Sequence, residues 1–392
     1  MVDYTYSITN DITNQAVNPY QLQTEISPTL PTVTAVTTEG DVLTITFSAS
    51  LLASEKTSLD TIVQDHVAET DEFFRSLYRP KDTYIISPSG GDFDTIKEGV
   101  DTVGAGSLLL IYPGTYTESN PLTQKANTVI RGMGLSITVN IVASTTTQPV
   151  FIMENNTILE GVTVMGANGT GGAGVYVDSS IGFGMVMVTR TIIQDCTTGF
   201  KTEFVSQVST YPPCTMTCLE TMVASTATTT VTVGYHCADG SLLRCIDTGV
   251  SGNAIQYIGT GYCSTGSHPS NGTASLLQIN GGGIQYATTG IDCNNDGHVD
   301  AHSLSIERST TGCKIGTTGT TSKLGIHSII FIDVSGNHIE TTNTNGNIYI
   351  TGGRIDRTRI SLPYPNSILY DVFYFSNESS NMSLQLNGIL SD

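Results

Sequence analysis

The sequence predicts a mainly β protein, in which a right-handed parallel β-helix follows a small α+β module. The chain has 392 residues, which suggests two domains, or one domain and an elongated repeat structure. Only 13% of the residues are charged, and Thr, Ser, Gly and Asn dominate the polar residues. That composition suits strands and turns and is poor for helices. Short alternating strands separated by Gly or Asn turns recur along most of the chain, as stacked coils require.

The small α+β module is predicted to span residues 1–81. The stretch VTAVTTEGDVLTITF at 33–47 alternates in the manner of a β-hairpin, with its turn at residues 39–41. The following residues 48–78 are predicted to form one helix, in which apolar side chains recur along one face. The segments TEGDVLTITF and LLASEKTSLDTIVQDH resemble a short module of phage and large-virus structural or fibre proteins. This resemblance implies an attachment module.

The β-helix is predicted to span residues 82–375, and a short capping helix is expected near 95–103. In this helix Ile96, Val100 and Val103 share one face. The end of a β-helix exposes unpaired backbone groups and an apolar core, and some element must cover that end. The three apolar side chains are suited to this role.

The opening of this region carries three segments, DFDTIKEGV, LLLIYPGTYTES and NTVIRGMG. Together they resemble the start of pectin-lyase-like right-handed parallel β-helix proteins. The resemblance implies the fold, but the fold does not give the function, because β-helices include lyases, hydrolases, esterases and structural spikes. The motif series of polygalacturonase-like and pectin-methylesterase-like enzymes do not occur in the sequence.

Three of the later repeats end in a glycine followed directly by an apolar residue. This step is expected to place Phe200, Ile291 and Cys313 at equivalent inward positions. At roughly 20 to 40 residues per coil, the region holds on the order of ten coils. Residues 376–392 are predicted to form a C-terminal strand or cap, which pairs with another chain or covers the last coil.

Charge and hydropathy restrict the partners. The formal net charge is −19 and no basic run occurs, so nucleic acid is not expected as a partner. No apolar run is long enough for a membrane span, and the N-terminus lacks the features of an ordinary secretory signal. Without such a signal, the eight cysteines are expected to be reduced thiols.

One polar segment, residues 292–300, has oxygen-bearing side chains at the spacing of a calcium loop, with Gly at the sixth position and Asp at the ninth. The twelfth position is Ser303, where an EF-hand has a bidentate Glu, and the flanks have the pattern of strands. A calcium site and a polar turn between two coils both fit this pattern, and no other cofactor is expected. The candidate ligands are Asp292, Asn294, Asp296 and Asp300.

Two groups of residues are candidates for catalysis. Arg354 and Asp356 share one face of a predicted strand, where a polysaccharide lyase could use an Arg to neutralise a uronate and a base to remove its α-proton. An Arg–Asp ladder on an outer face or a subunit contact is the alternative. A hydrolase pair needs carboxyl groups about 5 to 9.5 Å apart, and Asp195 and Glu307 take similar positions if the coils stack in register. The candidate carboxylates are Asp195, Asp247, Glu307 and Asp333.

The sequence therefore favours a structural or host-glycan-facing surface protein. It would be a spike-like component at the surface of a virion or similar particle, expected to form a homotrimer and to contact a cell-surface glycan or other virion proteins. The alternative is a polysaccharide lyase or glycoside hydrolase acting on a cell-surface glycan. A groove on one lateral face with two facing carboxylates, or with an Arg beside a carboxylate, would favour the enzyme. A bare, flat face would argue against it.

Overall fold

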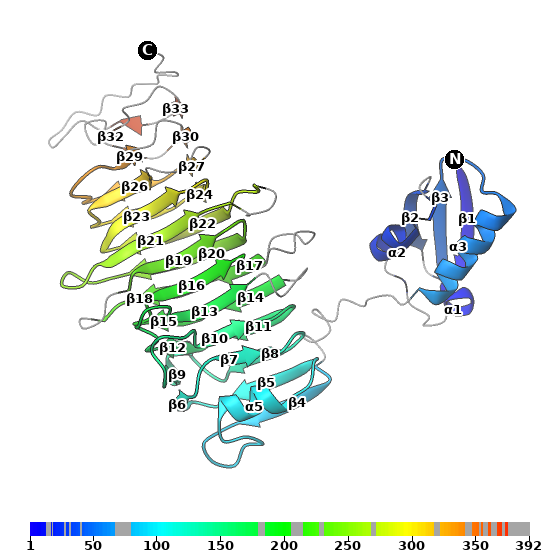
Figure 1. Ribbon diagram of the computed structural model, residues 1–392, viewed down its shortest axis with the longest axis horizontal. Helices are drawn as coiled ribbons and strands as arrows, with labels where there is room; N and C mark the ends of the chain where they lie inside the picture. Colours follow the sequence, from blue (N-terminus) through cyan, green and yellow to red (C-terminus); the bar gives the residue numbers. More distant parts are fainter. Residues whose placement is uncertain are drawn as a thin grey trace. The chain divides into compact units, whose positions relative to one another are not determined.

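The computed structural model divides into two compact units, Met1–Tyr78 and Arg79–Asp392, which are described in turn (Figure 1). The residues that it describes are 1–12, 17, 19–26, 29–30, 33–39, 41–66, 80–178, 185–204, 215–226, 231–267, 272–316, 322–341, 347–352, 354–355, 360–361, 367–370 and 373–374. The predicted C-terminal segment 376–392 lies outside the described residues.

The first unit is a three-stranded antiparallel sheet with helices against it. The predicted hairpin is confirmed, and the predicted helix is confirmed over residues 53–65. The strand at the chain start, which pairs with β3 to give the order β1-β3-β2, was not predicted. Leu43, Ile45 and Phe47 alternate along β3 and are buried together with Leu59 and Val63. The elements are β1 (Val2–Ser7), α1 (Ile8–Asp11), α2 (Pro19–Ile26), β2 (Val33–Glu39), β3 (Val42–Phe47) and α3 (Ala53–Asp65).

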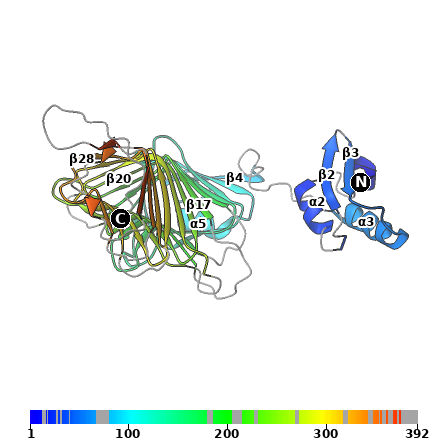
Figure 2. The same ribbon diagram turned by 90° about the horizontal axis from the view of Figure 1, so that it is seen from above.

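The second unit is a parallel β-helix of about nine turns, which confirms the predicted fold class. Its described strands form two parallel sheets of 21 and ten strands, here called sheet 1 and sheet 2. Most coils contribute two consecutive strand segments to sheet 1 and one strand to sheet 2. Figure 2 shows the successive coils overlying one another.

Sheet 1 begins at the N-terminal end of the unit with β4 (Asp82–Ile86), β5 (Ser107–Ile111), β6 (Gly114–Glu118), β8 (Val129–Gly132), β9 (Val139–Ala143), β11 (Thr157–Glu160) and β12 (Thr163–Met165). It continues with β14 (Met185–Thr189), β15 (Ile192–Gln194), β17 (Thr215–Leu219), β18 (Met222–Ala224), β20 (Leu242–Ser251), β22 (Leu276–Gln285), β24 (His298–His302) and β25 (Ser305–Glu307). It ends with β27 (Lys323–His327), β28 (Ile330–Ile332), β30 (Asn347–Thr351), β31 (Arg354–Ile355), β33 (Ser367–Tyr370) and β34 (Phe373–Tyr374).

Sheet 2 consists of β7 (Leu122–Gln124), β10 (Phe151–Met153), β13 (Ala173–Asp178), β16 (Thr198–Glu203), β19 (Val233–Ala238), β21 (Ile258–Thr265), β23 (Ala287–Asn294), β26 (Thr311–Ile315), β29 (Ile339–Thr341) and β32 (Ile360–Ser361). The short 3-10 helix η1 (Ser136–Thr138) lies between β8 and β9. No helix among the described residues is long and apolar enough to cross a membrane.

The predicted capping helix is present as α5 (Ile96–Thr102), which packs against β4, β6 and β7 at the N-terminal end of the β-helix (Figure 1). Ile96, Val100 and Val103 are buried in the same apolar cluster as the coils. The buried Glu118 carboxylate accepts hydrogen bonds from the backbone N–H groups of Ile96 (2.8 Å) and Lys97 (3.0 Å). This acidic cap satisfies donors that the first turn of a helix leaves unpaired.

Left-handed residues stand where the two sheet 1 segments of a coil meet. Gly161, Arg190 and Glu220 occupy this position in three successive coils, and Asp247 occupies the equivalent position within β20 of the next coil, with φ values of 68°, 47°, 52° and 49°. Such a φ is rare for residues with a side chain, but the register repeats it from coil to coil. We therefore interpret it as the regular corner of this β-helix.

The predicted inward positions are confirmed by the register of sheet 2. Phe200 pairs with Tyr235, Tyr235 with Tyr262, Tyr262 with Ile291, and Ile291 with Cys313. All five side chains are buried. The rings of Phe200 and Tyr235 stack at 5.0 Å and those of Tyr235 and Tyr262 at 4.9 Å. This column forms the central part of the core.

A glycine precedes each member of this column, and the five form a second column that we call the glycine ladder. A Cβ atom on Gly234 would lie 2.6 Å from the carbonyl oxygen of Gly261, and one on Gly261 would lie 2.7 Å from that of Gly290. Neighbouring coils therefore approach too closely for any side chain. The ladder consists of Gly199, Gly234, Gly261, Gly290 and Gly312.

The seven described cysteines are free thiols and are buried, and Cys214 lies outside the described residues. Burial raises the pKa of Cys237 to about 11 and that of Cys196 to about 12. The Cys237 and Cys196 thiols are therefore protonated at neutral pH, and the buried cysteines act as small apolar core residues.

Candidate functional site

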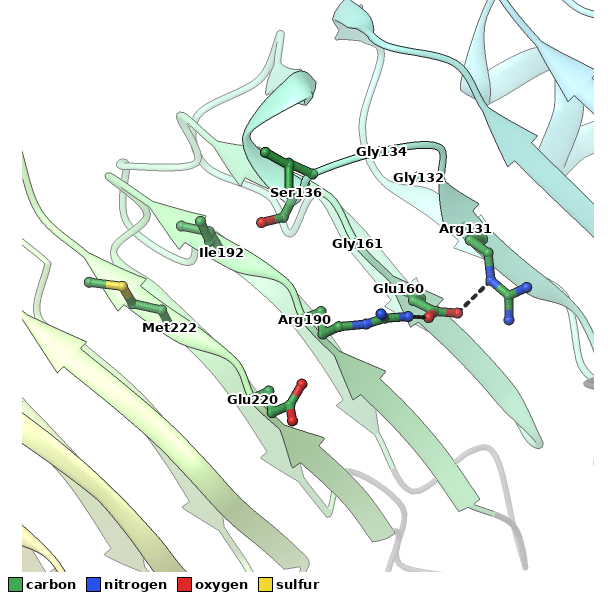
Figure 3. Close-up of a pocket in the computed structure, with 11 residues that line it drawn as sticks. Arg131, Gly132, Gly134, Ser136, Glu160, Gly161, Arg190, Ile192, Glu220 and Met222 are labelled. Carbon is green, nitrogen blue, oxygen red and sulfur yellow. Dashed lines mark hydrogen bonds and ion pairs between the residues drawn. The ribbon is translucent and has the colours of Figure 1, made fainter.

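The outer face of sheet 1 carries a groove with a volume of about 460 Å³. It extends across the C-terminal ends of β8, β11, β14 and β17, four neighbouring strands of the sheet (Figure 3). Its lining includes four charged side chains, three apolar ones, a serine and three glycines. These residues are Arg131, Gly132, Gly134, Leu135, Ser136, Glu160, Gly161, Arg190, Ile192, Glu220 and Met222.

An insertion at one coil corner forms one wall of the groove. Two residues join the sheet 1 segments in the next three coils, whereas the six residues 133–138 join β8 to β9. This longer connection contains η1. The Thr163 hydroxyl donates a hydrogen bond of 3.1 Å to the carbonyl oxygen of Ser136 and so fixes the connection to the next coil. Leu135, which directly precedes η1, is 69% exposed. The insertion therefore places an apolar edge beside the charged floor.

The floor of the groove is an ion-pair cluster centred on Glu160. The carboxylate of Glu160 accepts from Arg131 Nε at 2.6 Å through one oxygen and pairs with the guanidinium of Arg190 through the other. The Glu160 side chain is only 9% exposed, whereas that of Arg190 is 62% exposed. Because Glu160 holds two cations, Arg190 keeps a fixed direction while part of its guanidinium stays accessible from water.

Glu220 lies one coil beyond Arg190, at the same left-handed corner. Its side chain is exposed, and no hydrogen bond or ion pair joins it to another described residue. Figure 3 shows the Arg190 side chain extending toward Glu160, which leaves the Glu220 carboxylate open to the groove. Two strand spacings separate the backbones of Glu160 and Glu220, about 10 Å.

The charges of the groove balance, because two arginines accompany two glutamates. Ile192 and the partly exposed Met222 add apolar surface between them. A floor with fixed charged donors and acceptors beside apolar patches can bind a polyhydroxylated ligand, whose hydroxyl groups hydrogen-bond and whose C–H faces pack. This arrangement meets the criterion of a lateral groove with an Arg beside a carboxylate, which keeps the enzyme alternative open, although both arginines are already paired with Glu160.

The predicted carboxylates Asp195 and Glu307 lie far apart. The Asp195 carboxylate accepts from the backbone N–H (2.8 Å) and the hydroxyl (2.7 Å) of Thr226, and so joins two coils. Glu307 accepts from Gln285 at 3.1 Å. The register places Glu307 four coils from Gln194, the neighbour of Asp195, which corresponds to about 19 Å. Asp195 and Glu307 therefore do not have the separation of a hydrolase pair.

Asp247 and Asp333, the other two candidate carboxylates, occupy left-handed corners with φ values of 49° and 51°. Arg354 belongs to β31, but its side chain is outside the described part of the structure, as is the whole of Asp356. The lyase hypothesis for Arg354 and Asp356 therefore remains a prediction.

The candidate calcium ligands are divided between the two sheets. Asp292 and Asn294 belong to β23 of sheet 2, Asp296 lies in the turn with φ of 67°, and Asp300 belongs to β24 of sheet 1. Asp292 Oδ1 is buried without a hydrogen-bond partner among the described residues. Burial raises the pKa of the Asp292 carboxyl, although Asn294 and Lys314 act in the opposite direction. A corner between two strands thus replaces the continuous loop of an EF-hand.

The four charged residues of the groove were not predicted, although the sequence carries a signal for them. Arg131, Glu160, Arg190 and Glu220 follow one another at intervals of 29, 30 and 30 residues, each at or just after the end of an apolar strand. A charge that recurs at the length of one coil indicates a column on an outer face.

No protein-family model, curated protein or solved structure matches the chain. The function is therefore argued from the geometry of the site.

Proposed function

We propose that this protein is a structural, glycan-facing surface component of a virion or similar particle. In this proposal the β-helix is a rigid support, and the groove over β8, β11, β14 and β17 binds a saccharide. The observation that carries the proposal is the groove itself, with Arg190 held by Glu160 and with Glu220 open to water. Two resemblances support the proposal. The N-terminal segments resemble viral structural modules, which supports a place on a particle, and residues 92–134 resemble pectin-lyase-like proteins, which supports the β-helix as the rigid support.

The balanced charges favour a neutral saccharide. An acidic polysaccharide would meet a chain with a net charge of −19 and a groove in which both arginines already face a carboxylate. A neutral sugar can instead accept from the free N–H groups of Arg190 and donate to Glu220. Its apolar face can pack against Ile192 and Met222.

The charge reversal Arg190→Glu tests this proposal. It removes the fixed donor and places a second carboxylate beside Glu160, so we expect saccharide binding to weaken by about tenfold or more. Binding of the full chain to an array of neutral and acidic glycans is the measurement. The matched control is Lys97→Glu on α5, which makes the same change of charge away from the groove and is expected to retain binding. Equal binding by both variants, or no binding by the natural chain, would contradict the proposal.

The proposal includes a homotrimer, because spike-like rods cover their lateral faces and chain ends by symmetric association. Light scattering of the purified chain should then give three times the 41.6 kDa of one chain. A mass of 41.6 kDa that persists at high protein concentration would exclude the trimer but leave the groove proposal intact.

A glycoside hydrolase is the second candidate function, and the two carboxylates of the groove favour it. Glu160 and Glu220 face one depression from strands about 10 Å apart, and inverting hydrolases hold their carboxyl groups about 6.5 to 9.5 Å apart. An enzyme would release shorter saccharides from a bound glycan, and Glu220→Gln would abolish the release while retaining binding. Binding without release supports the structural role.

A further inference from the structure

Three side chains with metal-binding atoms converge on the outer face of sheet 1, beyond the groove. Asp300 and His302 are two residues apart on β24, so they point to the same face, and His327 on β27 pairs in register with His302. Asp300 Oδ1 lies 3.1 Å from His302 Nε2 and 3.3 Å from His327 Nε2. The three ligand atoms all lie within 4.8 Å of one another.

The two distances from Asp300 Oδ1 to the histidine nitrogens agree with those of a shared metal ion. In a tetrahedral zinc site with bonds of about 2.0 Å, neighbouring ligand atoms are about 3.3 Å apart. Both Nε2 atoms lie within 3.3 Å of Asp300 Oδ1, and the two imidazole rings stack at 4.2 Å with an interplanar angle of 13°. The side chains are 43%, 47% and 31% exposed for Asp300, His302 and His327, so an ion can enter from water.

The surroundings of this trio preserve the space and the ring orientation that a metal needs. Gly325 is the register partner of Asp300, and a Cβ atom there would lie 3.1 Å from Asp300 Oδ1 and 3.4 Å from His327 Nε2. Thr351, which pairs with His327 on the next coil, has its hydroxyl 2.6 Å from His327 Nδ1. When this hydroxyl accepts from Nδ1–H, the lone pair of Nε2 is available to a metal, as in sites where the second ring nitrogen is anchored.

A depression of about 440 Å³ adjoins Asp300 and His302, and Gln278 and Asn280 of the preceding coil also line it. Three protein ligands beside an open space leave room for water or a small ligand as a fourth group. Two imidazole nitrogens with one carboxylate oxygen suit Zn²⁺ and other late divalent transition metals, and they do not suit calcium, which prefers oxygen.

We propose that Asp300, His302 and His327 form a binding site for a divalent transition metal, with Zn²⁺ as the best-suited ion. Thr351 is a positioning residue, which acts through the His327 ring. The site is separate from the saccharide groove and does not depend on the proposed function.

Isothermal titration of the chelator-treated full chain with Zn²⁺ tests this site. We expect one Zn²⁺ per chain with micromolar or tighter affinity, lost in the His302→Ala and His327→Ala variants. Thr351→Val should weaken binding about 10-fold to 100-fold. The control His236→Gln changes a histidine on sheet 2, whose Nε2 lies 3.1 Å from the Thr265 hydroxyl oxygen, and should leave the titration unchanged. Circular dichroism establishes that each variant is folded.

A second measurement identifies the ligands. Co²⁺ in the site should give visible absorption bands of nitrogen and oxygen coordination, and the His302→Ala variant should lack them. A thiolate-to-cobalt band would assign the metal to a cysteine and overturn the proposal. Failure of the natural chain to bind Zn²⁺, or Zn²⁺ binding that survives both histidine substitutions, would also overturn it and leave the trio as a hydrogen-bonded cluster.

Discussion

Substitution of Gly234 by Val should unfold the β-helix at markedly lower denaturant concentration than the natural chain. A Cβ atom at this position would lie 2.6 Å from the backbone oxygen of Gly261 and 3.0 Å from the side chain of Val250. The two γ-methyl groups of Val would add further contacts, and neither neighbouring coil can move without breaking its own ladder. Overpacking of a core costs about 1–3 kcal/mol and occasionally more, and we expect at least about 3 kcal/mol here because backbone is displaced.

Urea denaturation followed by circular dichroism measures this effect. Gly104→Val is the matched control, because a Cβ atom at Gly104 would meet no atom within 4 Å, and its effect should stay within about 0.5 kcal/mol. Equal stability of the two variants would show that the coils do not pack as closely at the glycine ladder as the structure describes.

Replacement of Tyr235 by Ala is expected to have an effect of similar size for the opposite reason, loss of packing. The ring is fully buried and stacks between Phe200 and Tyr262, and its hydroxyl lies 2.9 Å from that of Thr221. Truncation of a buried aromatic ring to Ala costs about 3–5 kcal/mol, because the neighbours cannot close the cavity.

The milder variant Tyr235→Phe separates the two contributions. It keeps the ring and removes only the hydroxyl, so it should lower the free energy of unfolding by about 1 kcal/mol. Tyr349 on β30 provides the control, because its side chain is 41% exposed whereas that of Tyr235 is fully buried, so Tyr349→Ala removes less packing. If Tyr235→Ala were no more destabilising than Tyr349→Ala, the aromatic column would not be part of the core.

The features that were predictable depend on local pattern. The alternation of β3 and the face formed by Ile96, Val100 and Val103 gave elements that the structure contains. The Gly-apolar step is visible in the sequence of three coils. Its glycine belongs to the glycine ladder, where coils approach closely, and the next residue belongs to the inward-facing column of the core. Gly234 and Gly261 precede Tyr235 and Tyr262 in the same way.

The features that were missed depend on which coils are neighbours. Arg131, Glu160 and Arg190 meet only because the coils stack at intervals of 29 and 30 residues, and the groove also needs the insertion at 133–138. Asp195 and Glu307 occupy nearly equivalent corner positions, as expected, but four coils lie between them. Periodicity assigns a residue to a face, whereas a site requires the register between coils.

A crystal structure of the chain with a saccharide selected from the glycan array tests the central claim most directly. The account predicts a sugar over β8, β11, β14 and β17, with hydroxyl groups in hydrogen-bond contact with Arg190 and Glu220. A sugar bound on another face of the β-helix, with the groove over these four strands free, would contradict it.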